Sequence, residues 1–432
     1  MQLVAYGAQD IYLTGNPQIT FFKVVYRRHT NFSIESIEQN FDGDTSKLYR
    51  GGTKSVLISR NGDLIHKMWL DCKLTYDPVI LSDAVSYINW TNNTGHALIE
   101  ECDIEIGGQR MDKHTAQWLD IYNELTDHEE SDWIGLNKHA AKNAYLKSKK
   151  LTGTDPEKPL KLYIPFQFWF CRNVGLALPL IALQYHEVKL NIKFRSIYGL
   201  LNSDAVSCVT SEVAKIEPTL YVDYIYLDTD ERRRFAQVSH EYLIEQLQYT
   251  TNVAKKNLRL RFNHPIKEII WVMPYNKFQT SARVGNATLM DATITGEHTN
   301  DYFNYSASNA LPEFKENICG QDSYEGFSKA TIKLNGHTRF KERDASYFRL
   351  CQPRQAGHKI PTKHIYMYSF ALNPEEHQPS GTCNFSRLDN AELSFKDIND
   401  DIANNKYRLN VYGVNYNVLR IMSGMGGLAY SN

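Results

Sequence analysis

The sequence predicts an all-β chain built from two tandem antiparallel β domains, with a few short helices in loops. Three observations lead to this prediction: the length, an aromatic-rich composition, and an ordered repetition of short apolar runs. The chain has 432 residues, whereas single hydrophobic cores stop growing at about 250 to 300 residues. Two domains of about 200 residues each are therefore the expected partition.

The composition and the local patterns favour strands over helices. The 27 Tyr, 19 Phe and 6 Trp make 12% aromatic residues, and aromatic side chains suit a pleated, half-buried surface. Most apolar residues occur in short alternating runs closed by Gly, Asn, Asp or Pro, as in antiparallel strands with one buried face. The best candidate for a helix is 114–125 (HTAQWLDIYNEL), where apolar residues recur at helical spacing.

Five apolar patterns of the first half recur in the same order in the second half. The matches are Ile34-Glu35 and Ile37 with Ile244-Glu245 and Leu247; Leu57, Arg60, Ile65 and Met68 with Leu258, Arg261, Ile266 and Ile269; 103–110 with 331–338; 163–168 with 365–370; and Val188, Leu190 and Ile192 with Ala391, Leu393 and Phe395. Each match is weak alone, but their common order indicates two copies of one fold. Copies of roughly eight strands suit sandwich or jelly-roll packing, because two sheets then bury their inner faces against each other.

The spacing between matched patterns locates two insertions and a domain boundary. The spacing is 201 residues at the second match, 228 at the third and 202 at the fourth. This change places insertions at about 123–160 and 279–328, which we expect to be polar surface loops. The predicted division is an N-terminal segment (1–25), a first domain (26–229), a charged linker (230–240) and a second domain (241–432).

Charge and cysteine usage restrict the classes of partner. A net charge of -1 provides no global field that would attract a polyanion, so we expect no specific binding of nucleic acid. The chain has seven cysteines and no CxxC pair, which favours buried thiols over disulfides or zinc. The cysteines are Cys72, Cys102, Cys171, Cys208, Cys319, Cys351 and Cys383. Because the first residues also lack a basic, signal-like start, we expect synthesis in the cytosol.

No arrangement of residues makes a convincing catalytic, metal or cofactor site. Glu101, Asp103 and Glu105 share one face of a predicted strand and could seat a cation or serve a hydrolase, but alternation alone also predicts a solvated polar face there. His186-Glu187 and His240-Glu241 do not extend to HExxH, and the Gly-rich 423–427 lacks the Lys-Ser/Thr of a phosphate loop. The sequence therefore predicts a protein that is not an enzyme and has no cofactor, with 423–427 as a tight terminal turn.

Five long segments are distinctive: GAQDIYLTGNPQITFFKVVYRRHTNF from Gly7, GLALPLIALQYHEVKL from Gly175, HEYLIEQLQ from His240, QPSGTCNFSRLDNAEL from Gln378 and NYNVLRIMSGMGGLAY from Asn415. They resemble the major capsid proteins of nucleocytoplasmic large DNA viruses, of the chlorovirus, phycodnavirus and iridovirus type. The resemblance covers nearly the whole chain. It implies two tandem eight-stranded jelly rolls, a homotrimer of pseudo-hexagonal outline, and a role in tiling the icosahedral capsid of a virion assembled in the host cytoplasm.

The same resemblance suggests where partners bind. It places the amino-terminal segment at the inner side of the shell, near minor capsid proteins and the internal viral membrane. Two basic clusters, Arg27 with Arg28 and Arg232 with Arg233 and Arg234, lie beside aromatic residues at the start of each copy. Such mixtures can bind nucleic acid, but we predict that these five arginines make assembly contacts.

Two further expectations concern the second insertion. Asn286 and Asn304 stand in Asn-x-Ser/Thr sequences there and are candidates for glycosylation. Tyr302, Phe303 and Tyr305 suggest an alternative function, because exposed aromatic residues in this loop would suit a minor capsid or fibre-like jelly roll that binds glycans.

Overall fold

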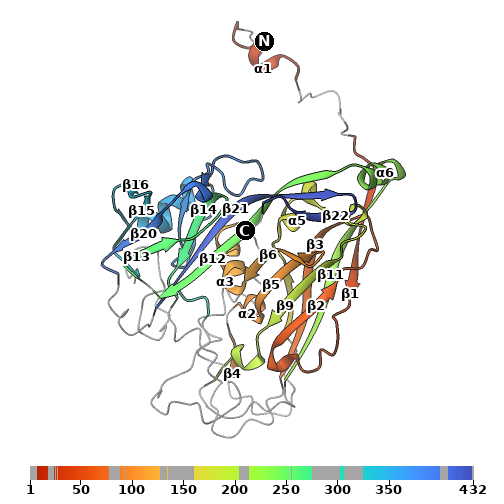
Figure 1. The fold of residues 1–432 in the computed structure, drawn as a ribbon, viewed down its shortest axis with the longest axis horizontal. Coiled ribbons are helices and arrows are strands. Elements are labelled where there is room, and N and C mark those ends of the chain that lie inside the picture. Colours follow the sequence, from red (N-terminus) through yellow and green to blue (C-terminus); the bar gives the residue numbers. More distant parts are fainter. Residues whose placement is uncertain are drawn as a thin grey trace, which may run out of the picture.

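The structure is a computed structural model, and it shows two β domains side by side (Figure 1). It describes residues 7–17, 24, 26, 28–76, 88–91, 93–126, 134, 160–203, 214–253, 255–274, 302–305, 325–398 and 407–430. Most of both predicted insertions lies outside these residues. Within them, no helix has the length and hydrophobicity needed to cross a membrane.

The first half contains two sheets that share eight main strands. Sheet I has the order β1-β11-β3-β7, and sheet II has the order β2-β9-β5-β6. Along the chain the strands pass from one sheet to the other, as in a jelly roll. The bounds are β1 Phe32–Gln39, β2 Gly52–Leu57, β3 Leu64–Tyr76, β5 Ile99–Ile106, β6 Gln109–Thr115, β7 Leu160–Pro165, β9 Val188–Phe194 and β11 Ala214–Leu227; the short β8 (Leu178–Pro179) pairs with β3, and β4 (Ile88–Trp90) pairs with β10 (Leu201–Ser203).

The second half repeats this arrangement. Sheet III has the order β12-β21-β14-β18, and sheet IV has the order β13-β20-β15-β16. The bounds are β12 His240–Val253, β13 Asn257–Leu260, β14 Pro265–Val272, β15 Lys329–Leu334, β16 His337–Thr338, β18 Tyr366–Ser369, β20 Ala391–Lys396 and β21 Arg408–Met422; three short strands, β17 (Arg343–Asp344), β19 (Cys383–Asn384) and β22 (Met425–Leu428), pair with β15, β14 and β21. The two halves therefore have the same strand order in both sheets, which confirms the predicted duplication and the tandem eight-stranded jelly rolls.

Two of the five sequence matches are out of register by one residue. Leu57 is 43% exposed, whereas its predicted counterpart Leu258 is 5% exposed, so the buried Val56 is the true counterpart. In the first match the slip is in β1 and β12. Glu38 of β1 pairs with Tyr221 of β11, and Tyr249 of β12 pairs with Tyr412, the equivalent residue of β21. Tyr249 is therefore the counterpart of Glu38, one residue later than the match predicts. A shift of one residue turns every side chain of a strand to the other face, and two apolar residues at period two do not define the register.

The helices are short, and those after α1 lie between strands along the chain. The α-helices are α1 Ile11–Thr14, α2 Thr94–Leu98, α3 Ala116–Leu125, α5 Trp169–Arg172, α6 Thr229–Gln237 and α7 Gln352–Gln355. The 3-10 turns are η1 Leu48–Arg50, η3 Val174–Leu176, η4 Leu180–Ala182, η5 Ile197–Gly199 and η9 Phe385–Arg387, and η8 Tyr347–Cys351 is a π-helical turn. The predicted helix at 114–125 begins at Ala116 instead, because His114 and Thr115 still pair with β5. The Thr115 side chain then caps the helix by accepting a hydrogen bond from the Trp118 amide.

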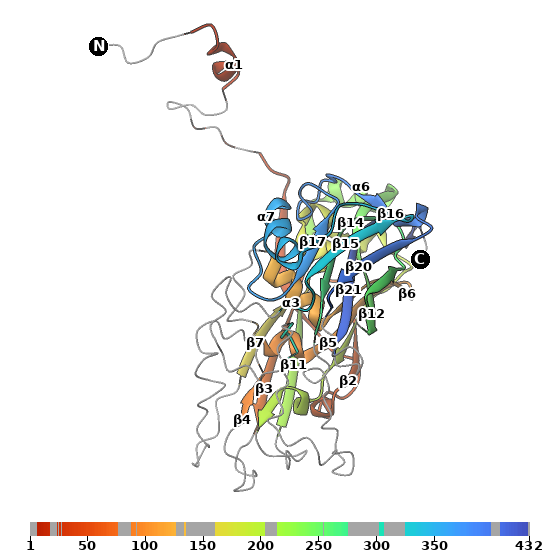
Figure 2. The ribbon, with the colours of Figure 1, turned by 90° about the vertical axis from the view of Figure 1, so that its left-hand side faces the viewer.

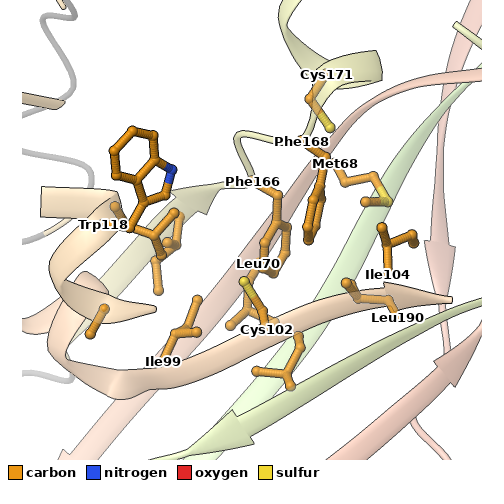
Figure 3. Packing of buried hydrophobic residues seen from close by; sticks show 14 of the residues in the cluster. Met68, Leu70, Ile99, Cys102, Ile104, Trp118, Phe166, Phe168, Cys171 and Leu190 are labelled. Carbon is orange, nitrogen blue, oxygen red and sulfur yellow. The ribbon is translucent and has the colours of Figure 1, made fainter. Parts of the chain in front are cut away.

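The core of the first half is filled by aromatic and aliphatic side chains from both sheets. Figure 3 shows Leu70, Ile104 and Leu190 packed beneath Phe166 and Phe168. Phe166, Phe168 and Phe170 stack in series at centroid distances of 6.1 and 6.0 Å. Each buried side chain of this size contributes about 1.5 to 3 kcal/mol.

The described cysteines agree only in part with the predicted buried thiols. Cys72, Cys102 and Cys171 are free and buried, and burial raises the pKa of Cys171 to about 12. Cys383 is half-buried, and Cys351 is exposed at the end of η8. Cys208 and Cys319 lie outside the described residues.

Candidate assembly surfaces

The amino-terminal segment projects from the body of the molecule. In both views α1 lies away from the two jelly rolls (Figures 1 and 2). Tyr12 and Tyr26 are 88% and 84% exposed, and Arg28 is also exposed. Arg27 lies outside the described residues. The described part of this segment is thus accessible to a partner.

The second basic cluster lies on α6, between the two halves of the chain. Arg232 has a partner within the chain, because its Nε lies 2.9 Å from a carboxylate oxygen of Asp63. Asp63 also accepts a hydrogen bond from the Leu227 amide, so this ion pair fastens α6 to the loop before β3. Arg233 and Arg234 are exposed, and they are the residues of the cluster that a partner can reach.

Two of the three carboxylates on β5 have side-chain partners on the neighbouring strands. Lys113 Nζ lies 2.8 Å from Glu101, and the Asn191 amide donates to Asp103 at 2.9 Å. Among the described residues, no group of three or more His, Cys, Asp or Glu side chains has the arrangement of a metal site. Glu101 and Asp103 thus lie in ordinary cross-strand contacts of an antiparallel sheet.

The histidines of the two histidine-glutamate pairs lie near backbone carbonyl groups. His186 Nδ1 lies 3.0 Å from the Gly426 carbonyl oxygen, and His240 Nε2 lies 2.8 Å from the Phe235 carbonyl oxygen. The Gly-rich stretch 423–427 forms the turn and the start of the returning strand β22, as predicted for a terminal turn. This hairpin packs on the first half, where the Tyr185 amide donates to the Gly424 carbonyl.

The aromatic residues proposed for glycan binding are buried, so that expectation is wrong. Tyr302, Phe303 and Tyr305 are 4%, 5% and 2% exposed and belong to the main hydrophobic core. The Tyr305 hydroxyl donates to the buried carboxylate of Asp120 at 2.9 Å. Asn304, between them, is half-buried, and Asn286 lies outside the described residues.

One face of sheet III is covered by the first half of the same chain. The Trp118 ring of α3 lies 5.7 Å from the Tyr412 ring, and the Tyr412 hydroxyl donates to Gln117 at 3.0 Å. At the edge of the sheet, the Leu247 amide of β12 donates to Asp112 of β6 at 3.0 Å. The hydrophobic core consequently runs from the first half onto the outer face of sheet III without a break.

We call this contact between the first half and the outer face of sheet III the junction. Charged side chains are buried within it, and the sequence analysis missed them. Glu245 of β12 accepts from Arg172 at 2.8 Å and lies 2.6 Å from Lys267 Nζ. The side chains of Glu245 and Lys267 are 8% and 3% exposed. Because charges are buried only when they are paired, this cluster holds the halves in one relative position. The available signal was Lys267-Glu268 within the otherwise apolar run PIKEIIWV.

A buried histidine lies at the margin of the same cluster. His358 lies between Glu268 and Glu375, at 2.8 and 2.5 Å. Burial alone would lower the pKa of His358, but the two carboxylates outweigh it and raise the pKa to about 9. A cavity of ≈ 20 Å³ adjoins His358, Arg172 and Trp118, which is room for about one water molecule.

The matching face of sheet I is open in the single chain. Tyr163 is 37% exposed, and Trp69 and Tyr221 beside it are half-buried. The charged pairs on this face are exposed, as in Lys73 and Glu217 at 3.5 Å. The edge strand β1 is exposed along most of its length. Among the described residues, this face combines partly exposed aromatic residues with an edge strand that pairs on one side, which is typical of a protein contact surface.

Comparisons with known protein families match almost all of the chain. Residues 20–228 match a family model described as the major capsid protein N-terminus. Residues 231–427 match a second model, described as the large eukaryotic DNA virus major capsid protein.

Individual relatives span the same length. The chain is 46% identical to the major capsid protein of Pyramimonas orientalis virus and 41% identical to that of Paramecium bursaria Chlorella virus 1, each comparison covering 100% of this chain and 99% of the relative. Among solved structures, PBCV-1 VP54 fitted into a reconstruction of the virophage Sputnik has a TM-score of 0.70 at 34% identity, covering 96% of this chain and 100% of that chain. The Faustovirus major capsid protein has the same fold, with a TM-score of 0.68 at 12% identity, covering 96% of this chain and 94% of that chain.

Proposed function

The chain belongs to the major capsid proteins of large eukaryotic DNA viruses, and from this premise we propose that three copies associate into a capsomer of pseudo-hexagonal outline. As a major capsid protein it is a component of the virion capsid. The observation that carries the proposal is the equal strand order of the two halves. Three chains then present six similar lobes, and a ring of six lobes can fill a six-fold lattice position.

The test of this proposal is the native mass of the full chain. Light scattering on the purified protein is expected to give three times the monomer mass of 49.8 kDa. A protein that remains monomeric at micromolar concentration and above would rule out the trimer.

We further propose that the amino-terminal segment joins the capsomer to the inner layer of the particle, near minor capsid proteins and the internal membrane. The projecting position of α1 and the exposure of Arg28 support this proposal. Arg27→Ala with Arg28→Ala is expected to lower the particle yield while leaving the thermal unfolding of the chain unchanged. A normal particle yield would contradict a role of these arginines in assembly.

The remaining roles follow from the same family membership. We propose that the protein is not an enzyme, since Glu101 and Asp103 have partners within their own sheet. We also propose that the protein is synthesised and assembled in the host cytoplasm. We propose that the two domains are divided at 230–240, most of which α6 occupies.

An intact mass of virion-derived protein tests the proposed glycosylation of Asn286 and Asn304, and an unmodified mass would contradict it.

A further inference from the structure

The junction within the chain indicates how two chains could contact each other, because the two halves carry equivalent surfaces. The outer face of sheet III, with its edge strand β12, is covered by β6 and α3 of the first half. The equivalent face of sheet I, with its edge strand β1, is open. We propose that sheet I of one copy docks on the second half of a neighbouring copy, with β1 lying along the 337–343 segment as β12 lies along β6. This inference rests on the proposed trimer and names the surfaces through which its copies touch.

Strand pairing identifies the equivalent residues on the docking face. In sheet I, Trp69 of β3 pairs with Tyr221 of β11, which pairs with Glu38 of β1. In sheet III, Ile270 of β14 pairs with Tyr412 of β21, which pairs with Tyr249 of β12. The neighbouring strands agree, since Trp69 pairs with Pro165 and Ile270 with Met367, a match that the sequence pattern also makes. Glu38 therefore occupies the position of Tyr249.

A pair of matching turns identifies the equivalent residues on the receiving side. Gly107 and Gly108 connect β5 to β6 with φ of 59° and 79°, and Asn335 and Gly336 connect β15 to β16 with φ of 51° and 79°. Both turns are thus of the left-handed type that suits a tight hairpin. Counted from the turn, Lys341 stands at the position of Lys113.

These two equivalences predict one specific contact between copies. In the junction within the chain, Lys113 Nζ lies 5.8 Å from the centre of the Tyr249 ring. When the junction is repeated between chains, Glu38 replaces the ring and Lys341 replaces Lys113. A cation that lies against an aromatic ring inside the chain then lies against a carboxylate between chains, and the attraction becomes an ion pair.

The charges of the two strands are complementary beyond this pair. The charged residues of β1 are Glu35 and Glu38, both exposed. The 337–343 segment (HTRFKER), which is exposed except for the half-buried Phe340, carries three basic residues, Arg339, Lys341 and Arg343, against the single acidic Glu342. In the part of the chain that the structure describes, no ion pair involves Arg339 or Lys341. Opposed charges of this kind set the register and orientation of a protein contact.

Two apolar side chains of β1 are also largely exposed in the single chain. Phe32 and Ile34 are 52% and 50% exposed on an edge strand, and an uncovered apolar edge favours pairing with another chain. Covering it with a second copy removes this edge. Because the contact joins a first half to a second half, it is heterologous, and three such contacts alternate with the three junctions within chains to close a ring.

Charge reversal tests the contact in the full-length protein. We expect Glu38→Lys alone and Lys341→Glu alone to raise the concentration for half-dissociation of the trimer by about tenfold or more, measured by light scattering over a dilution series. The double variant Glu38→Lys/Lys341→Glu is expected to recover most of the wild-type affinity. The controls are the wild type and Glu376→Lys, which reverses an exposed charge on the loop after β18, and Glu376→Lys is expected to change little.

The outcomes separate this inference from the proposed trimer. A wild-type monomer would overturn both. A wild-type trimer whose two single reversals dissociate like the controls, or whose double variant does not recover, would overturn only the docking surfaces.

A second measurement covers variants that fold poorly. Glu38→Cys/Lys341→Cys, treated with a short bifunctional maleimide, is expected to give covalent trimers in denaturing electrophoresis, whereas either single cysteine variant is not. The single variants also control for the exposed Cys351. A trimer that gives no additional cross-link in the double variant would contradict the contact.

Discussion

Sheets I and III have the same strand order but lie in different surroundings, and their side chains differ accordingly. The outer face of sheet III carries fully buried residues such as Ile270 and Val414, together with the paired charge of Glu245. The outer face of sheet I carries half-buried Trp69, exposed Tyr163 and exposed ion pairs. The comparison teaches that one copy of the fold is completed by its own chain, whereas the other is left with a surface suited to a partner.

Removal of a buried charge should show the largest difference between the two faces. Glu245→Ala leaves Arg172 and Lys267 without their shared carboxylate, and breaking a buried pair costs about 3 to 5 kcal/mol. Glu217→Ala breaks an exposed pair with Lys73 and should cost less than about 1 kcal/mol. Denaturant unfolding of the two variants measures both values, and equal losses of stability would contradict the difference between the two faces.

The two tryptophans offer a second contrast. Trp118→Ala removes a fully buried ring that packs on sheet III, and we expect a loss of about 3 to 5 kcal/mol in the free energy of unfolding. Trp69→Ala on sheet I should destabilise the monomer less, but it should weaken the trimer, since aromatic residues dominate contact energies. Unfolding and dissociation measured on the same samples separate these effects; an unchanged trimer affinity for Trp69→Ala would argue against docking on this face.

The pH dependence of stability should report on the junction. The pKa of His358 is raised to about 9, so the protonated ring stabilises the folded state fully below pH of about 6.5. This contribution, about 3 kcal/mol in total, should be lost as the pH rises through 9. The free energy of unfolding from pH 6 to 9.5, compared between the wild type and His358→Gln, measures the loss. A decline of equal size in the variant would assign the effect to other groups.

The smallest expected contrast lies within the basic cluster on α6. Arg232→Ala leaves the side chain of Asp63, 8% exposed, without its cation, and should cost about 1 to 2 kcal/mol. Arg233→Ala removes an exposed side chain and should change stability by about 0.5 kcal/mol or less. Thermal unfolding of both variants checks the contrast. An effect of Arg233→Ala on particle yield alone would support its role in assembly.

Much of the fold could be predicted from the sequence because it depends on local patterns. The tight turn at Asn335-Gly336, the strand at 102–106 and most of the helix at 116–125 follow from residue type and spacing alone. The register was less accessible. Leu57 and Leu258 occupy similar patterns, but Leu57 is exposed and Leu258 is buried. A few apolar residues do not fix an alignment to the exact position, and an error of one residue assigns every side chain of a strand to the wrong face.

By itself, the sequence determined the duplication, the common order of the repeated patterns and the polar composition of both insertions, because these features depend on residue type and spacing along the chain. Only the tertiary structure decided which faces are covered. Tyr302, Phe303 and Tyr305 stand in a polar stretch and yet lie in the core, and Lys267 and Glu268 lie in a strand interior because partners from distant segments neutralise them. Burial is a property of contacts between residues far apart in sequence, so local pattern does not contain it.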